Sequence, residues 1–113
     1  MIDYAVRIIN LSEALPDTRA GKHVATQTLK SGTSPAPNYG EAQSAESNDD
    51  FVHKIKIALK ELRETRVWLL IATRRGMFKP PEGAKVALAE CEELVRILAK
   101  SVKPAESGLK KGD

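Results

Sequence analysis

The sequence predicts an all-α protein, arranged as an antiparallel up-down four-helix bundle. Apolar residues recur at helical spacing in four segments, and prolines, glycines and helix-capping residues separate those segments. No run alternates apolar and polar residues as a strand would. The 113 residues fit one domain, and short links favour antiparallel neighbours. We expect residues 1–103 to form the bundle and residues 104–113 to form a disordered basic tail.

The first helix is expected from Met1 to about Leu15. Pro16 ends it, because proline lacks a backbone donor and crowds the preceding turn. Its core face has apolar residues at i, i+4, i+7 and i+11, which are Tyr4, Ile8, Leu11 and Leu15.

The second helix is expected from about Asp17 to Glu46, with an interruption. Pro35 and Pro37 lie two residues apart and disturb any continuous helix, so we expect a kink, or a break with a restart, near Ser34–Pro37. Before the kink runs a stripe of mostly small residues, which are Ala25, Thr28, Leu29 and Gly32.

The third helix is expected from about Asp49 to Arg75. Ser47 with Asp50 three residues later resembles a capping box, and Gly76 marks the end. Its predicted core residues are Phe51, Ile55, Ala58, Leu59, Leu62, Thr65 and Leu69.

The last helix is expected from about Glu82 to Val102. Pro80 and Pro81 open it, and Pro104 stops it. Its predicted core residues are Ala87, Cys91, Leu94, Leu98 and Val102.

Composition limits the classes of protein that fit the chain. A single cysteine, Cys91, excludes an intrachain disulfide and favours a reducing, cytoplasmic setting. We see no signal peptide and no apolar run of about 18 residues, so we expect no membrane span. The net charge of +3 is only mildly basic.

A second stripe lies off the core face of the third helix, with residues spaced alternately by four and three, as in a heptad seam. The last helix repeats the pattern. Mixed apolar and charged stripes suit a subunit interface, whereas a solvated surface with scattered apolar residues is the alternative. The predicted oligomer interface consists of Ile57, Glu61, Glu64, Trp68, Ile71, Val86 and Ile97.

No set of residues predicts catalysis, a cofactor or a metal site. His23 and His53 lie on different helices without a carboxylate or cysteine at helical spacing. Cys91 sits in an apolar stripe, which indicates a buried side chain rather than a nucleophile. We therefore expect no enzyme.

Basic residues concentrate on the third helix. Eight cationic side chains and two carboxylates between Phe51 and Lys79 give a local charge of +6. A solvated face is one explanation, and weak, salt-dependent binding of RNA or DNA is the other. The candidate nucleic-acid-binding residues are Lys56, Lys60, Arg63, Arg74 and Arg75.

Two blocks of sequence resemble a known family. Ser31-Gly32-Thr33-Ser34 and Ile57-Ala58-Leu59-Lys60-Glu61 are similar to the bacterial four-helix-bundle proteins, also called 23S ribosomal RNA intervening-sequence proteins. The resemblance spans about Tyr4 to Val102.

The resemblance implies an antiparallel bundle that forms a homopentamer, with no settled biochemical function. A related branch is the accessory protein of diversity-generating retroelements, a basic pentamer that works with a reverse transcriptase and nucleic acid. We therefore expect a non-catalytic, self-assembling protein. The alternative is a nucleic-acid-binding accessory subunit, such as a partner of a retroelement reverse transcriptase.

Overall fold

The chain folds into a helical bundle in the computed structural model, which describes the backbone of residues 1–112 and the side chains of residues 1–104. No strand occurs in that part of the chain. The bundle measures 52 × 21 × 19 Å. Its five helices are α1 (Ile2–Glu13), α2 (Arg19–Thr33), α3 (Pro35–Gln43), α4 (Asn48–Arg74) and α5 (Glu82–Gly112).

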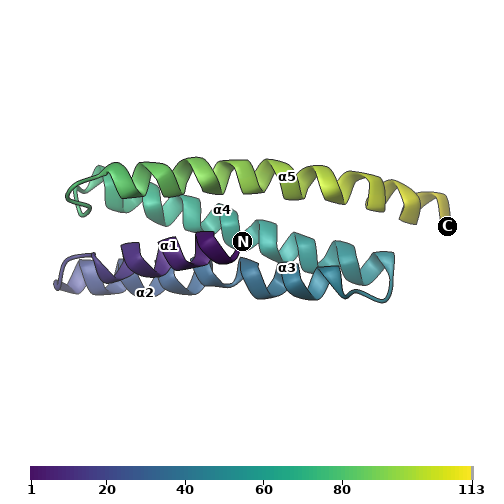
Figure 1. The fold of residues 1–113 in the computed structure, drawn as a ribbon, viewed down its shortest axis with the longest axis horizontal. Helices are drawn as coiled ribbons and strands as arrows, with labels where there is room; N and C mark the ends of the chain where they lie inside the picture. Colours follow the sequence, from purple (N-terminus) through teal and green to yellow (C-terminus); the bar gives the residue numbers. More distant parts are fainter. Residues whose placement is uncertain (113) are drawn as a thin grey trace.

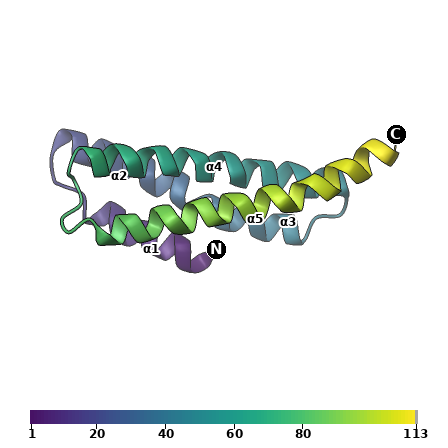
Figure 2. The ribbon, with the colours of Figure 1, turned by 90° about the horizontal axis from the view of Figure 1, so that it is seen from above.

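The helices lie roughly parallel to one long axis (Figure 1). After α1 the chain turns into α2, and α3 continues from α2 along the same side of the molecule. A second turn leads into α4, which runs back along the length, and a third turn leads into α5. Figure 2 shows α5 beside α4 and extending beyond the turn between α3 and α4.

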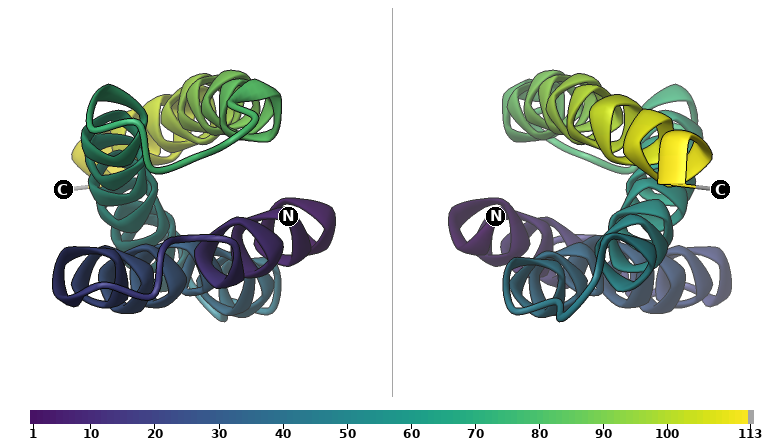
Figure 3. Two further views of the ribbon diagram at one scale, coloured as in Figure 1. Left: turned by 90° about the vertical axis from the view of Figure 1, so that its left-hand side faces the viewer. Right: turned by 90° about the vertical axis from the view of Figure 1, so that its right-hand side faces the viewer.

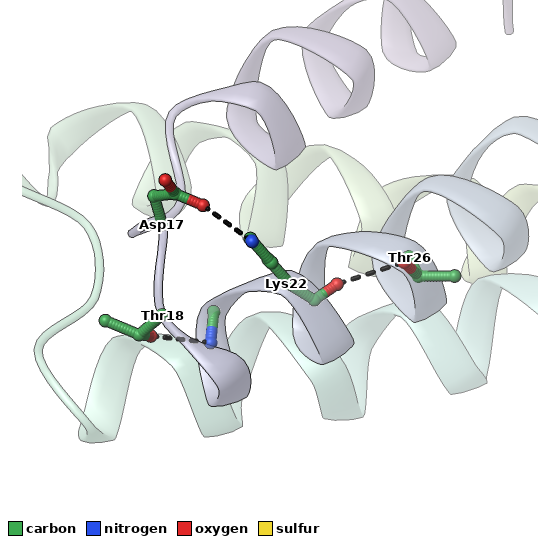
Figure 4. A network of polar contacts seen from close by, with 5 residues as sticks. Asp17, Thr18, Lys22 and Thr26 are labelled. Carbon is green, nitrogen blue, oxygen red and sulfur yellow. Dashed lines mark hydrogen bonds and ion pairs between the residues drawn. The ribbon is translucent and has the colours of Figure 1, made fainter.

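Capping residues start α2 and α4. Thr18 precedes α2, and its hydroxyl accepts a hydrogen bond of 3.0 Å from the Gly21 amide (Figure 4). In the same network Lys22 forms an ion pair of 3.2 Å with Asp17. Ser47 caps α4, as predicted, because its hydroxyl accepts from the Asp50 amide at 3.1 Å.

The interruption predicted near Ser34–Pro37 is present as a boundary between two helices. α2 ends at Thr33 and α3 begins at Pro35. Ser34 between them keeps helical dihedral angles of −65° and −35°. Proline fits the first position of a helix because its missing N–H would have had no partner there. The second predicted helix is therefore divided into α2 and α3, with the single residue Ser34 between them.

The end predicted for the last helix was wrong. We expected Pro104 to stop it near Val102, but α5 runs from Glu82 to Gly112 with Pro104 inside it. Both Pro104 and Lys100 are exposed. The Lys100 carbonyl that loses its N–H partner thus stays near water, which lowers the cost of a proline here. The side chains from residue 105 on lie outside the described residues. The disordered tail expected over residues 104–113 therefore stays a prediction.

The core is aliphatic, and most of its predicted residues are buried. The third and last predicted helices bury Ile55, Leu62 and Leu69 and also Cys91 and Leu98, each at 2 % exposure or less. Leu29 was wrongly placed in the small-residue stripe of α2, since it is 41 % exposed. Further buried residues lie outside the predicted core faces, and they include Val52, Ala72, Phe78 and Ala84.

Close helix packing explains the small residues of α2. A side chain on Gly32 would overlap Ile8 Cγ2 of α1, so only glycine permits this approach of the two helices. Thr28 and Ser31 are fully buried beside it. The Ser-Gly-Thr-Ser sequence therefore has a packing role in this fold.

Candidate interaction surfaces

The interior contains a cluster of buried polar side chains. Thr65 of α4 lies with its hydroxyl 2.9 Å from that of Ser31 on α2, and the Cys91 thiol of α5 donates to the Leu62 carbonyl at 3.2 Å. The hydroxyls of Tyr4 and Thr28 are buried without a well-formed hydrogen bond to any of the side chains or backbone groups that the structure describes. Burial raises the pKa of Tyr4, and the neighbouring Cys91 raises it further.

This cluster is closed to solvent and has no nucleophile ready to react. Burial raises the pKa of the Cys91 thiol, which keeps it protonated. Among the described side chains, no group of three or more His, Cys, Asp and Glu residues is placed to hold a metal ion. No described helix is both long enough and apolar enough to span a membrane.

The predicted oligomer interface divides into two parts in the structure. Ile57, Glu61 and Trp68 are half-buried against their own chain. The Trp68 ring meets the His23 ring of α2 edge-on, with centroids 5.7 Å apart and planes at 76°. Trp68 remains partly exposed beside this contact, so its place in a subunit interface stays a prediction.

The remaining predicted interface residues face outward. Ile71 on α4 is 43 % exposed, and Val86 and Ile97 on α5 are 49 % and 52 % exposed. Glu64 is also exposed. These side chains are available for contact with another molecule.

Other exposed apolar side chains were missed by the sequence analysis. Val67 on α4 is 51 % exposed, and three residues of α1 project outward beyond the predicted core face. Those three are Ile2, Val6 and Ile9. The sequence already contains this pattern, because Ile2, Val6 and Ile9 are spaced by four and three residues. They form a second apolar line on the first helix, separate from the predicted core face.

Three of the five candidate nucleic-acid-binding residues line one groove. Lys56, Lys60 and Arg63 of α4 face Lys103 of α5 across a hollow of about 380 Å³ with an apolar floor of Leu59, Ala99 and Val102. Arg74 and Arg75 lie outside it, at the end of α4. The structure thus brings part of the predicted set together and adds a cation from α5.

Arg63 also borders a second hollow of about 580 Å³ farther along α4 and α5. Arg66 and Arg96 supply two more cations there, and Glu92 supplies a carboxylate. Arg66 and Glu92 form an ion pair of 3.2 Å with both side chains about half exposed, so it contributes little stability. Sequence reasoning missed Arg96 and Lys103 because only the fold places α5 beside α4. We call the two hollows together the α4–α5 groove.

Comparisons with known proteins point to one family. The family model for the 23S rRNA-intervening sequence protein matches residues 1–100. A crystal structure from Bacteroides thetaiotaomicron, described as a protein of unknown function from the S23 ribosomal protein family, is similar to this chain. The two are 34 % identical, with a TM-score of 0.82, over 90 % of this chain and 94 % of that one. A search of curated proteins gave no match.

Proposed function

This chain belongs to the 23S rRNA-intervening sequence protein family, and we propose that it is a non-catalytic protein whose role is to assemble with copies of itself, as a homopentamer. The observation that carries the proposal is the set of exposed apolar side chains that follow its long helices. Ile71, Val86 and Ile97 are each between 43 % and 52 % exposed and lie among charged residues. Apolar positions mixed with charges at helical spacing are typical of subunit interfaces. Five as the number of copies follows from the family resemblance.

We infer that each subunit is an antiparallel up-down bundle in which α2 and α3 together form one kinked helix. Support comes from the three turns that reverse the chain and from the single residue, Ser34, between α2 and α3. Four elements of this kind bury one continuous apolar core.

The absence of catalysis is part of the proposal. The buried Cys91 thiol and the partnerless Tyr4 hydroxyl are the unusual reactive groups of the described chain, and both are closed to substrate. A single buried cysteine also suits a reducing cytoplasm, where we place the protein.

The mass of the purified protein in solution tests self-assembly. Light scattering or analytical ultracentrifugation is expected to give five times the 12.4 kDa of one chain. Ile71→Glu is expected to lower that mass, because it places a charge on an exposed apolar position. Ala20→Glu is the matched control, because Ala20 is exposed on α2, which has no residue of the proposed interface. A single-chain mass for the wild type at every concentration would refute the proposal.

A second candidate function is binding of RNA or DNA, and the α4–α5 groove favours it. Six cationic side chains and one carboxylate line the groove: Lys56, Lys60, Arg63, Arg66, Arg96, Lys103 and Glu92. Phosphate groups attract such an array, and the attraction weakens with salt because counterions are released. An accessory subunit of a reverse transcriptase would use a surface of this chemistry.

A salt titration tests this second candidate. Affinity for a labelled single-stranded RNA or DNA is expected to fall steeply as salt rises, and the combined Arg63→Ala and Arg96→Ala change is expected to flatten the slope by about 0.7 for each lost phosphate contact. Arg19→Ala on α2 is the control, since Arg19 lies outside the groove. No binding at low salt, or binding indifferent to salt, would remove the candidate.

A further inference from the structure

The outer side of α1 carries a stripe of apolar residues that its own subunit leaves uncovered. Ile2 is 75 % exposed, Val6 50 % and Ile9 38 %, and Ile2 is the most exposed large apolar residue within residues 1–104. With Glu13 they are spaced by four, three and four residues, so they lie in one line along the helix. We call these four residues the α1 stripe. Asp3 is exposed beside it, and Arg7, which also borders Val6, is paired with Glu90 at 3.0 Å, so the unpaired charges beside the stripe are mainly carboxylates.

The outer side of α4 carries a matching stripe. Val67 and Ile71 are 51 % and 43 % exposed at its centre. The residues continue in both directions with the same alternating spacing, and we call the line the α4 stripe. It consists of Lys60, Glu64, Val67, Ile71 and Arg74. Its cations stand at the two ends, Arg63 adds another beside it, and Glu64 is its acid.

The two stripes lie on opposite sides of one subunit. Figure 3 views the bundle along its length and places α1 and α4 at opposite corners. Both helices run in the same direction along the long axis (Figure 1). An outward face on α1 and an outward face on α4 therefore cannot meet within one chain, but each can meet the other on a neighbouring copy.

Contacts to shared neighbours show that the stripes are also at the same level. Arg7 of α1 and Arg66 of α4 bind carboxylates of α5 that are two residues apart, Glu90 at 3.0 Å and Glu92 at 3.2 Å. On the other side, Ile8 lies against Gly32 of α2 and Thr65 contacts the adjacent residue Ser31. Both pairs of contacts show that the middle of α1 and Thr65 of α4 are at the same height along the bundle axis, to within about one helical turn.

We propose that the α1 stripe of one copy packs against the α4 stripe of a second copy, in a head-to-tail interface that rests on the proposed self-assembly. Rotation about an axis parallel to the bundle keeps both the direction and the level of each helix. At this common level, which the contacts give to within one helical turn, Val6 and Ile9 lie against Val67 and Ile71, and Glu13 lies near Arg74. The occupant is a second copy because its stripe matches in length, apolar position and charge. Two different surfaces that meet in this way close into a ring when the rotation divides the circle.

Mixing two complementary variants tests the interface. Val6→Glu breaks the α1 stripe and leaves the α4 stripe intact, whereas Val67→Glu does the reverse, and both positions are half exposed, so the core is not disturbed. Each variant alone is expected to run as a single chain of 12.4 kDa. An equimolar mixture is expected to form dimers and nothing larger, because one intact pair of stripes remains. Ala20→Glu, which adds the same charge at an exposed position of α2, is expected to keep the wild-type mass.

A cross-linking measurement covers the case in which either glutamate variant loses helicity by circular dichroism. Ile9→Cys mixed with Ile71→Cys is expected to give a disulfide between copies on mild oxidation, whereas each variant alone gives little. The native Cys91 is fully buried and does not compete. Absence of this disulfide in an oligomeric protein would overturn the interface.

The outcomes separate this interface from self-assembly itself. An oligomeric wild type whose mass survives Val6→Glu and Val67→Glu, but not Ile97→Glu on α5, overturns the α1–α4 contact and keeps self-assembly. A wild type that is a single chain at all concentrations overturns both.

Discussion

The hydroxyl of Thr65 on α4 lies 2.9 Å from the hydroxyl of Ser31 on α2, and both residues are fully buried. Each hydroxyl also reaches a carbonyl of its own helix, Glu61 at 2.8 Å and Gln27 at 3.0 Å. The pair thereby joins the two helices through a satisfied polar contact inside an aliphatic core.

Removal of one member of this pair is expected to destabilise the fold. Thr65→Val keeps the volume but loses the hydroxyl, so the free energy of unfolding should fall by about 1 kcal/mol in urea titrations followed by circular dichroism. The double variant with Ser31→Ala should cost less than the sum of the two single changes, because the lost contact is shared. Additive costs would show that the two hydroxyls do not interact.

Gly32→Ala is expected to destabilise the protein although alanine favours helices. The new methyl group would overlap Ile8 Cγ2, and crowding of a packed core costs about 1–3 kcal/mol. Gly40→Ala is the matched control, since no heavy atom lies within 4 Å of its added carbon, and it should stabilise by about 0.5–1 kcal/mol. Thermal unfolding of both variants checks that Gly32→Ala lowers the stability of the protein and Gly40→Ala raises it. A Gly32→Ala protein as stable as Gly40→Ala would contradict the close approach of α1 and α2.

Tyr4→Phe is expected to stabilise the protein by about 1 kcal/mol at neutral pH. The Tyr4 hydroxyl is buried close to Cys91 and Thr65 but meets hydrogen-bond geometry with neither, and such a group costs free energy that phenylalanine does not. Urea titration at pH 7 measures the difference. Lower stability of the variant would mean that the hydroxyl makes a favourable contact.

The raised pKa of Tyr4 also leads us to expect a loss of stability at alkaline pH. Burial raises the pKa of Tyr4 above its ordinary value of 10.0, so above that pH the unfolded chain loses the proton while the folded chain keeps it. The free energy of unfolding then falls as pH rises, by up to about 1.4 kcal/mol per pH unit. Tyr4→Phe should show a shallower fall than the wild type between pH 10 and 11. Parallel curves for the two proteins would contradict the raised pKa.

Ser47→Ala is expected to lower the free energy of unfolding by about 1 kcal/mol. The Ser47 hydroxyl accepts from the Asp50 amide at the first turn of α4, and alanine leaves that donor without its partner. Ser47→Asp should retain most of the stability, because aspartate caps helices equally well. Chemical denaturation of the three proteins compares them, and equal stability of all three would argue against the cap.

The local features of the fold were predictable because they depend on residues near in sequence. The Ser47 cap, the boundary near Ser34 and the core faces built on Ile8, Leu62 and Cys91 follow from spacing and from the chemistry of proline and serine. The end of α5 was not predictable in this way. Pro104 weakens a helix locally, but the cost depends on whether the freed carbonyl stays exposed.

The candidate surfaces were only partly predictable. Helical spacing places Lys60 and Arg63 on one helix, but it cannot pair them with Arg96 or Lys103, which lie more than thirty residues farther along the chain. The edge-on contact of the Trp68 ring with His23 of α2 was also not predictable, because the two residues lie far apart in the chain.

The order of the residues is enough to predict that the chain is helical, where its helices start and which face of each is apolar, because hydrogen bonds within a helix join residues four apart. Which apolar residues stay uncovered depends on how the helices pack. Ile8 and Val6 are both apolar and two residues apart, yet Ile8 is fully buried against α2 and Val6 is 50 % exposed. Burial depends on which helices lie next to each other, and that is set by contacts between residues far apart in the chain.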